Sequence, residues 1–197
     1  MPTRSFFNSA AAAALFLALF AVCSQAAEPF GFDLKGHPVR QLAGHGVRVV
    51  VLVFAASDCP ISNRYVPEID RLNHRFSSQG ARIWWVYPNA GDTAAVVSQH
   101  NREFAITESV LLDPRQTLVG LAQATITPEA AVFLVEGASL REVYHGRIDD
   151  RYISIGRERP QAEHHDLETA IAAALAGKPV PQPGGRAVGC SIVPVQR

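Results

Sequence analysis

The chain has 197 residues, 48% of them hydrophobic, and its 18 basic residues balance its 18 acidic residues. This length is enough for one domain with one sizeable core. The balanced charge gives no basic surface of the kind that nucleic-acid-binding proteins show, so we expect no nucleic-acid partner.

The first 26 residues have the pattern of a secretory signal peptide. Arg4 supplies a positive start, residues 11–22 (AAAALFLALFAV) are apolar, and small residues at 24–27 suit cleavage after Ala26. The apolar run is shorter than the roughly 20 residues that span a bilayer. We therefore expect a periplasmic or secreted protein with no membrane attachment after cleavage. A lipid anchor on Cys23 is a second interpretation, disfavoured because Val22 is bulkier than the residue that usually precedes such a cysteine.

The next segments predict a hairpin, a buried strand and a helix. Residues 32–42 alternate like a strand but are interrupted by Gly36 and Pro38, which predicts a short hairpin. Residues 47–54 (VRVVVLVF) form a β-branched run typical of a strand covered on both faces. Pro60 suits the start of a helix that ends at Gly80, with one apolar face: Ile61, Tyr65, Ile69, Leu72 and Phe76.

The rest of the chain alternates strands and helices. We predict strands at 81–88 and 109–113, two joined strands within 129–148, and helices at 93–106, 115–124 and 166–177. This order predicts an α/β domain over residues 27–177, with a central mixed sheet and helices on both faces. Residues 178–197 contain four prolines and three glycines, so we predict an extended C-terminal arm rather than another packed element.

Two cysteines remain after the signal peptide, Cys59 and Cys190, which allow one disulfide. Cys59 lies between a strand and a helix, where unpaired backbone N–H groups and the helix dipole favour a thiolate and so a nucleophile. Asp58 opposes this effect and Arg64 supports it. A buried structural cysteine fits the same position.

Four motifs, in their order and spacing, resemble those of secreted thioredoxin-like proteins of the redoxin superfamily. This superfamily includes the alkyl hydroperoxide reductases and the thiol-specific antioxidant proteins. They are DCPISNRYVPEI at 58–69, TPEAAVFLV at 127–135, GRIDDRY at 146–152 and VGC at 188–190. The resemblance covers residues 30–177. It implies a thioredoxin-like fold, here with an N-terminal hairpin and a C-terminal arm.

The resemblance also implies roles for individual residues. Cys59 matches the nucleophile, and Ser62 stands where the second cysteine of the CxxC motif is expected. Pro67 matches the proline that kinks the active-site helix, and it removes one helical hydrogen bond. Thr127 and Pro128 match the cis-proline segment, whose backbone edge pairs with an extended peptide.

Because the motif is CxxS, Cys190 is the candidate resolving thiol. These residues predict a periplasmic thiol–disulfide oxidoreductase that needs no cofactor. Its expected substrates are protein thiols or disulfides, or a small thiol or peroxide. We expect a monomer or a weak dimer. A static Cys59–Cys190 disulfide is the alternative, since closing so long a loop stabilises a fold by up to about 5 kcal/mol.

Two other functions stay open. A thiol peroxidase would place a hydroxyl residue and a proline before the cysteine, where this chain has Ala56 and Val53. A redox-inert or copper-handling binding protein would use histidines as metal ligands. Four histidines stand out, but we assign none of them to a metal: His100, His145, His164 and His165. The charged GRIDDRY motif is interpreted as a solvated turn with weak surface ion pairs.

Overall fold

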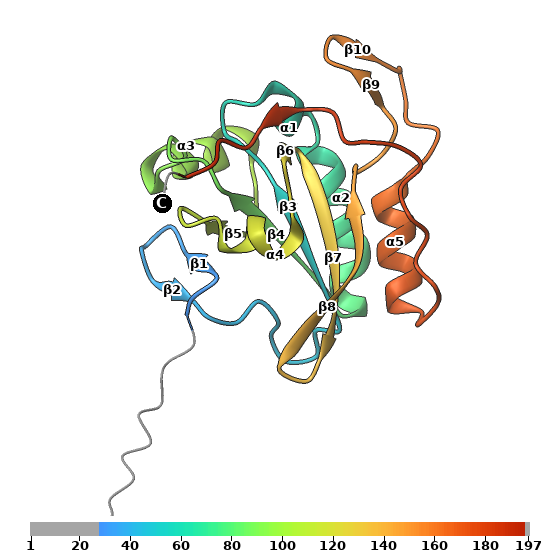
Figure 1. The fold of residues 1–197 in the computed structure, drawn as a ribbon, viewed down its shortest axis with the longest axis horizontal. Helices are drawn as coiled ribbons and strands as arrows, with labels where there is room; N and C mark the ends of the chain where they lie inside the picture. Colours follow the sequence, from blue (N-terminus) through green and yellow to red (C-terminus); the bar gives the residue numbers. More distant parts are fainter. Residues whose placement is uncertain (1–27, 196–197) are drawn as a thin grey trace, which may run out of the picture.

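The computed structural model describes residues 28–195, so the predicted signal peptide lies outside the described residues. A seven-stranded sheet forms the centre, in the order β2-β1-β5-β4-β3-β7-β8 (Figure 1). Its strands are β1 Gly31–Phe32, β2 Pro38–Val39, β3 Val49–Phe54, β4 Ala81–Tyr87, β5 Ser109–Leu112, β7 Glu129–Glu136 and β8 Ser139–Gly146. Two small ladders stand apart from it: β6 Ile126–Thr127 with β11 Cys190–Ser191, and β9 Tyr152–Ser154 with β10 Arg157–Glu158.

The helices are α1 Pro60–Arg64, α2 Val66–Phe76, α3 Ala94–Phe104, α4 Thr117–Ala122 and α5 Asp166–Leu175. Within residues 28–195, no helix combines the length and the hydropathy that crossing a membrane requires. The predicted helix from Pro60 to Gly80 is divided, because α1 ends at Arg64 and α2 starts with Pro67 in its first turn. Gly80 (φ 97°) follows a short 3-10 turn and ends the segment as predicted.

The sheet is mixed, as predicted. β4 is parallel to both β3 and β5, whereas β7 is antiparallel to β3 and to β8. β1 and β2 form the predicted N-terminal hairpin, which continues the sheet by pairing antiparallel to β5. β3 is an internal strand, and all six of its residues are buried.

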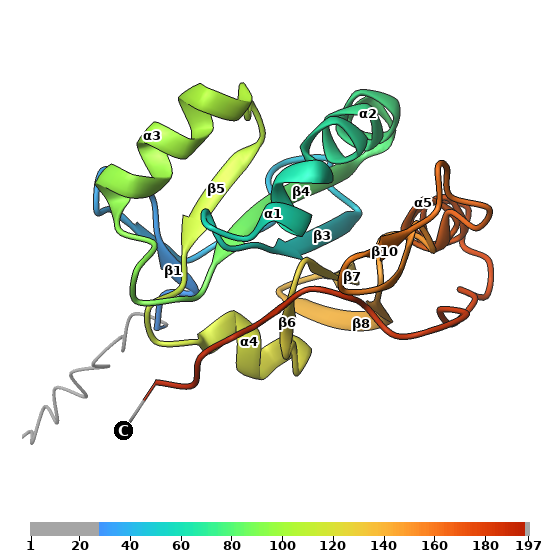
Figure 2. The same cartoon turned by 90° about the horizontal axis from the view of Figure 1, so that it is seen from above.

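Alternation along β3 creates two apolar layers. Val49, Val51 and Val53 pack with the buried faces of α2 and α5, and Val50, Leu52 and Phe54 pack with α4. Figure 2 shows α2 and α3 on one side of the sheet and α4 on the other. The prediction of an α/β domain with helices on both faces is confirmed.

The C-terminal arm packs against the domain, which its proline- and glycine-rich sequence did not indicate. The arm is extended, but Ala187 and Ile192 are buried, and Ile192 belongs to the layer that contains α4. Two residues of the arm form β11, which pairs with β6. Figure 1 shows the arm, in red, crossing the top of the domain past α1 and β6.

The GRIDDRY motif is not a solvated turn. Arg147 and Asp166 form a largely buried ion pair, with Nε 2.7 Å from Oδ2. Asp149 and Asp150 are buried and accept hydrogen bonds from neighbouring side-chain and backbone groups. The sequence interpretation missed this because charged residues at such a density are usually on a surface, whereas here each carboxylate has a donor.

Candidate active site

The two cysteines meet at the carboxyl end of β3. Cys59 is fully buried and directly precedes α1, whereas Cys190 is exposed in β11. Their Sγ atoms lie 2.6 Å apart although 131 positions separate the residues. The structure therefore brings both candidate reactive sulfurs into direct contact.

The segment that contains Thr127 and Pro128 forms the wall of this site. The Thr127–Pro128 peptide bond is cis, as the resemblance implies. The Cys59 thiol donates to the Thr127 carbonyl oxygen at 3.3 Å. In the β6–β11 ladder Thr127 faces Cys190, and its hydroxyl donates to the Cys190 carbonyl oxygen at 3.3 Å. Thr127 therefore contacts both cysteines.

The surroundings of Cys59 favour its thiolate. Burial raises the pKa of the thiol, but donors beside it lower the pKa by more, chiefly the Cys190 thiol and then Ser62. The net pKa of Cys59 is therefore below the ordinary value. The Ser62 hydroxyl is buried and has no hydrogen-bond partner while Cys59 is a thiol. It is thus free to donate to a thiolate at Cys59.

Cys190 has the opposite tendency. The pKa of this thiol is raised to about 12, mainly because its sulfur is partly shielded from water. The hydrogen bond to Cys59, the charge of a Cys59 thiolate and the charge of Asp58 raise the pKa as well. Of the two cysteines, Cys59 is therefore the one that ionises first. A cavity of about 400 Å³ lies beside Cys190 and Asp58, so solvent reaches this side of the pair.

The loop before Cys59 is held by Ser57, Asp92 and Asn63, which the sequence analysis did not single out, and by His100 behind them. Ser57 donates to Asp92 Oδ1 through its backbone N–H at 3.0 Å and through its hydroxyl at 2.5 Å, while burial raises the pKa of Asp92. Asn63 donates to the Ser57 carbonyl at 3.3 Å and contacts His100 Nε2 through Oδ1 at 2.8 Å. His100 also contacts the Tyr87 hydroxyl at 3.1 Å. His100 therefore holds a buried network rather than standing free for a metal.

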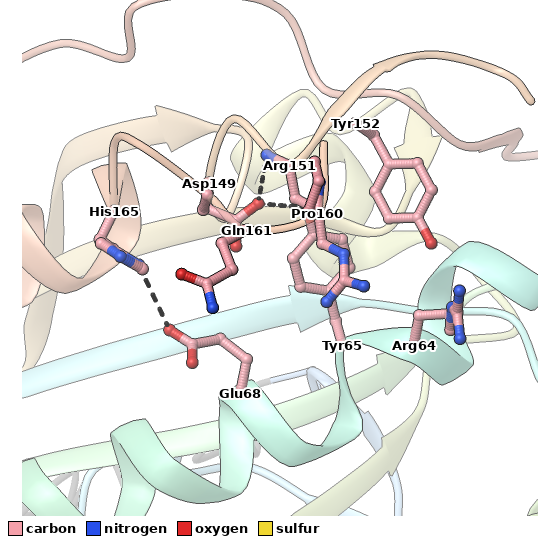
Figure 3. Close-up of a pocket in the computed structure, with 10 residues that line it drawn as sticks. Arg64, Tyr65, Glu68, Asp149, Arg151, Tyr152, Pro160, Gln161 and His165 are labelled. Atoms are coloured by element: carbon pink, nitrogen blue, oxygen red, sulfur yellow. Dashed lines mark hydrogen bonds and ion pairs between the residues drawn. The ribbon is translucent and has the colours of Figure 1, made fainter. Parts of the chain in front are cut away.

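Arg64 and Pro67 are not brought to the sulfur atoms. The Arg64 guanidinium pairs with Glu158 at 3.0 Å, and Arg64 faces a separate cavity of about 250 Å³. Figure 3 shows this cavity between α1, α2 and the segment after β8, with the Tyr65 hydroxyl bound to Asp149. Pro67 lies eight residues after Cys59, in the first turn of α2, where the segment breaks from α1.

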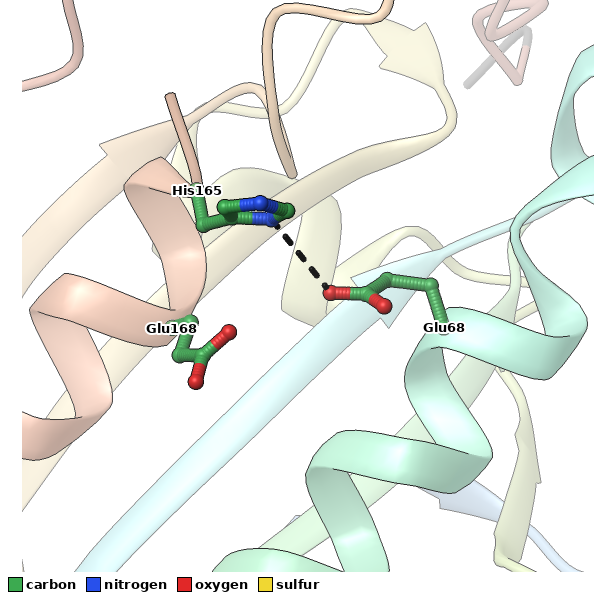
Figure 4. Close-up of side chains that lie close together, drawn as sticks. All are labelled: Glu68, His165 and Glu168. Carbon is green, nitrogen blue, oxygen red and sulfur yellow. Dashed lines mark ion pairs between the residues drawn. The ribbon is translucent and has the colours of Figure 1, made fainter. Parts of the chain in front are cut away.

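Two clusters of His, Asp and Glu side chains lie in this part of the molecule, and Glu68 and His165 of the first cluster also line this cavity. Figure 4 shows Glu68, His165 and Glu168, which come close enough to share an ion. Arg71 pairs with both Glu68 and Glu168, so these carboxylates already have cationic partners. The second cluster is Asp150, Glu163 and His164, and there Asp150 accepts the backbone N–H groups of the other two residues. His145 lies 3.2 Å from Glu129, beside the Thr127 segment.

A buried cysteine follows the first long parallel strand and lies beside a cis-proline, and the mixed sheet ends in a β-β-α unit. The fold is thioredoxin-like. No family model matches the chain, and no curated protein matches it.

Solved structures resemble it at low sequence identity. A hypothetical protein from Sinorhizobium meliloti 1021 has a TM-score of 0.69 and 21% identity, over 85% of this chain and 91% of that one. An uncharacterized conserved protein from Geobacillus kaustophilus has a TM-score of 0.62 and 22% identity, over 85% and 89% of the two chains. A secreted disulfide oxidoreductase from Mycobacterium tuberculosis has a TM-score of 0.49 and 12% identity, over 76% and 96%. These likenesses concern the fold.

Proposed function

We propose that the protein is a thiol–disulfide oxidoreductase in which Cys59 attacks the substrate disulfide and Cys190 resolves the mixed disulfide. The observation that carries this proposal is the contact between the two sulfur atoms at 2.6 Å, made beside a cis-proline segment. Ser62 cannot resolve a mixed disulfide, and within residues 28–195 Cys190 is the other cysteine. The remote thiol thus stands in for the one that the CxxS motif lacks.

The exchange conserves atoms and electrons. The Cys59 thiolate attacks one sulfur of a substrate disulfide, forms a mixed disulfide and releases the first substrate thiolate. The Cys190 thiol then loses its proton, and its sulfur attacks Cys59. This step breaks the mixed disulfide, forms the Cys59–Cys190 bond and releases the second substrate thiolate, which takes up the proton. The substrate gains two electrons, the protein loses two, and an external dithiol reduces the protein again.

The two pKa shifts support this division of roles. Cys59 has the lowered pKa and attacks first, since the thiolate is the nucleophile. The pKa of Cys190 is raised while Cys59 carries charge beside it. Once Cys59 is in a mixed disulfide that charge is gone, so the same neighbour no longer opposes ionisation of Cys190. Resolution is therefore favoured only after the first attack.

The substrate class and the compartment are part of the proposal. The signal-peptide pattern favours a periplasmic or secreted location, where disulfides persist. A protein disulfide or a small disulfide is the favoured substrate. Peroxide is disfavoured, because Ala56 and Val53 offer no hydroxyl or proline to orient it and both are buried apolar residues.

The test compares the wild type with Cys59→Ser and Cys190→Ser. With a small disulfide and a dithiol reductant we expect turnover by the wild type, none by Cys59→Ser, and a trapped mixed disulfide on Cys59 in Cys190→Ser, detected by intact mass. The exposed Ser191→Ala change is the matched control and should leave turnover unchanged. Hydroperoxide consumption is measured in parallel and would favour the peroxidase alternative. A Cys59–Cys190 bond that resists reduction until the chain unfolds would make the bond structural and overturn the proposal.

A further inference from the structure

The β9–β10 hairpin, which projects from the domain (Figure 1), carries an arginine that is left unpaired. Arg157 is exposed, and within residues 28–195 its guanidinium has no hydrogen-bond or ion-pair partner. The next residue, Glu158, pairs instead with Arg64 of α1 at 3.0 Å and with Arg151 at 3.6 Å. Glu158 is therefore occupied by two other arginines, and the charge of Arg157 is uncompensated.

A cavity of about 310 Å³ lies between this hairpin and α1. Its charged lining residues are Arg64, Arg157 and Glu158, so two positive charges face one negative charge. Pro60 and Ile61, at the start of α1, add an apolar surface. This combination suits an organic anion with a short hydrocarbon chain, because the chain contacts the apolar residues while its charged end meets a guanidinium.

The cavity starts at the residue next to the reactive cysteine. Cys59 directly precedes α1, and Pro60, the first residue of α1, lines the cavity. A helix rises about 1.5 Å per residue, so Arg64 at the end of α1 lies only roughly 6 Å beyond Pro60 along the helix axis. A disulfide sulfur at Cys59 therefore brings a carboxylate on a short side chain within reach of the cavity's arginines.

The cavity beside Cys190 has the opposite charge. Asp58 and Asp92 line it, and its described lining includes no lysine or arginine. It shares no lining residue with the cavity beside α1. An anionic substrate is therefore repelled from the Cys190 side and attracted to the α1 side, where it leaves Cys190 in place.

The buried aspartates of the GRIDDRY motif hold the hairpin in this position. Tyr152, the first residue of β9, packs against Tyr65 with ring centroids 5.8 Å apart, and the Tyr65 hydroxyl donates to Asp149 at 2.5 Å. After β10, the Arg159 guanidinium donates to the Asp150 carbonyl oxygen at 2.5 Å. Both ends of the hairpin are thus fixed to the domain, so its unpaired arginine has a defined place beside α1.

We propose that the cavity between α1 and the β9–β10 hairpin binds the carboxylate of a small organic disulfide, and that Arg64 and Arg157 select anionic disulfides over neutral and cationic ones. The inference rests on the proposed function, because it names the substrate class of Cys59. With dithiodipropionate, attack by Cys59 breaks the sulfur–sulfur bond and releases one mercaptopropionate. Resolution by Cys190 releases the second, and an external dithiol returns the two electrons to the protein.

The first experiment compares three disulfides of similar length: dithiodipropionate is anionic, hydroxyethyl disulfide is neutral and cystamine is cationic. Dithiothreitol is the reductant, and the uncatalysed rate is subtracted. For the wild type we expect kcat/KM to fall in that order. Arg157→Glu should lower the ratio of kcat/KM for dithiodipropionate to kcat/KM for cystamine by about tenfold, because it reverses the sign of the interaction with both substrates. Arg157→Lys keeps the charge and should keep the order.

The matched control is Arg102→Glu, which changes the net charge by the same amount. Arg102 is exposed and likewise has no partner among the described residues. It lies in the last turn of α3, which runs from the end of β4 back to the start of the parallel strand β5, so it lies at the end of the sheet away from Cys59. Arg102→Glu should leave the ratio unchanged. An equal fall in both glutamate variants, or equal kcat/KM for the three disulfides in the wild type, would overturn the inference.

A second measurement does not depend on turnover. Suberate has methylene groups in place of the two sulfurs of dithiodipropionate, so it can bind but cannot react. Added to the reduced wild type, it should cause saturable NMR shifts of the amides of Ile61 and residues 152–158, with weaker binding to Arg157→Glu. Hexanediamine, the corresponding analogue of cystamine, should cause none. Absence of the suberate shifts would overturn the inference. Suberate binding without turnover of any of the three disulfides would overturn the proposed function and leave the anion site standing.

Discussion

Thr127 and Cys190 are joined at two points: they face each other in the β6–β11 ladder, and the Thr127 hydroxyl donates to the Cys190 carbonyl oxygen at 3.3 Å. The Thr127 carbonyl oxygen meanwhile accepts the Cys59 thiol. One residue thus sets the positions of both sulfurs. The distance between the cysteines is therefore determined locally, although they are remote in sequence.

The first prediction concerns this hydroxyl. Thr127→Val keeps the shape of the side chain and removes a hydrogen bond worth about 1 kcal/mol, so resolution by Cys190 should slow by about fivefold. Thr127→Ser keeps the hydroxyl and should resolve at nearly the wild-type rate. Rapid-quench mass spectrometry of the decay of a mixed disulfide on Cys59 measures this rate. Equal slowing by both variants would show that the methyl group, not the hydroxyl, positions the arm.

The second prediction concerns Ser62. In a Cys190→Ala background only Cys59 titrates among the described thiols, and its thiolate absorbance gives its pKa. Ser62→Ala removes a donor to the thiolate, so it should raise the pKa of Cys59 and move alkylation by iodoacetamide to higher pH. The exposed Ser191→Ala change in the same background should leave the titration in place. A pKa that stays constant in Ser62→Ala would show that the backbone N–H acts alone.

The third prediction concerns the ion pair beneath the arm. Asp166 accepts the Gly184 N–H at 3.0 Å, and a Cβ at Gly185 would lie 2.7 Å from the Arg147 guanidinium, so the arm rests on this pair. Arg147→Gln should loosen the arm and speed tryptic cleavage after Arg186 by roughly tenfold, because cleavage follows local opening.

Timed digestion with mass spectrometry measures that cleavage. The control is Arg141→Gln, which breaks an exposed ion pair with Glu136 at the β7–β8 turn. Its cleavage rate should match the wild type. Equal acceleration in both variants would point to general destabilisation instead of local release of the arm.

The fourth prediction concerns pH. The Glu129 carboxylate, 3.2 Å from His145 Nε2, raises the pKa of His145 above its ordinary value, although burial opposes this effect. The stabilisation by this pair is therefore complete below about pH 6.5, the pKa of His145 in the unfolded chain. It is lost as the pH rises through the higher pKa of His145 in the folded protein. The free energy of unfolding of the wild type, relative to His145→Gln, should be larger at about pH 5.5 than at about pH 8.5.

Urea titrations at the two pH values measure this difference. Glu129→Gln keeps an oxygen to accept the Thr125 N–H, a contact of 2.9 Å, but removes the charge that His145 faces. This variant should lose the same pH dependence. A wild-type advantage that is constant with pH would contradict the role of the pair.

The elements with strong local signals were predictable from the sequence. The β-branched run of β3, the proline after Cys59 and the order of strands and helices depend on neighbouring residues, and all of them predicted the fold class. The docking of the arm was not predictable in this way. It depends on Ile192 meeting α4 and on Gly189 meeting Thr127, which are contacts between distant positions. The burial of the GRIDDRY charges was missed because several of their partners come from other segments: Tyr65 donates to Asp149, and Asp166 pairs with Arg147.

The burial of Ile192 has a thermodynamic consequence. This side chain packs in the layer beneath the sheet, so undocking of the arm transfers apolar surface into water. Exposure of apolar surface increases the heat capacity. The balance between the docked and the undocked arm must therefore shift with temperature along a curve rather than a straight line.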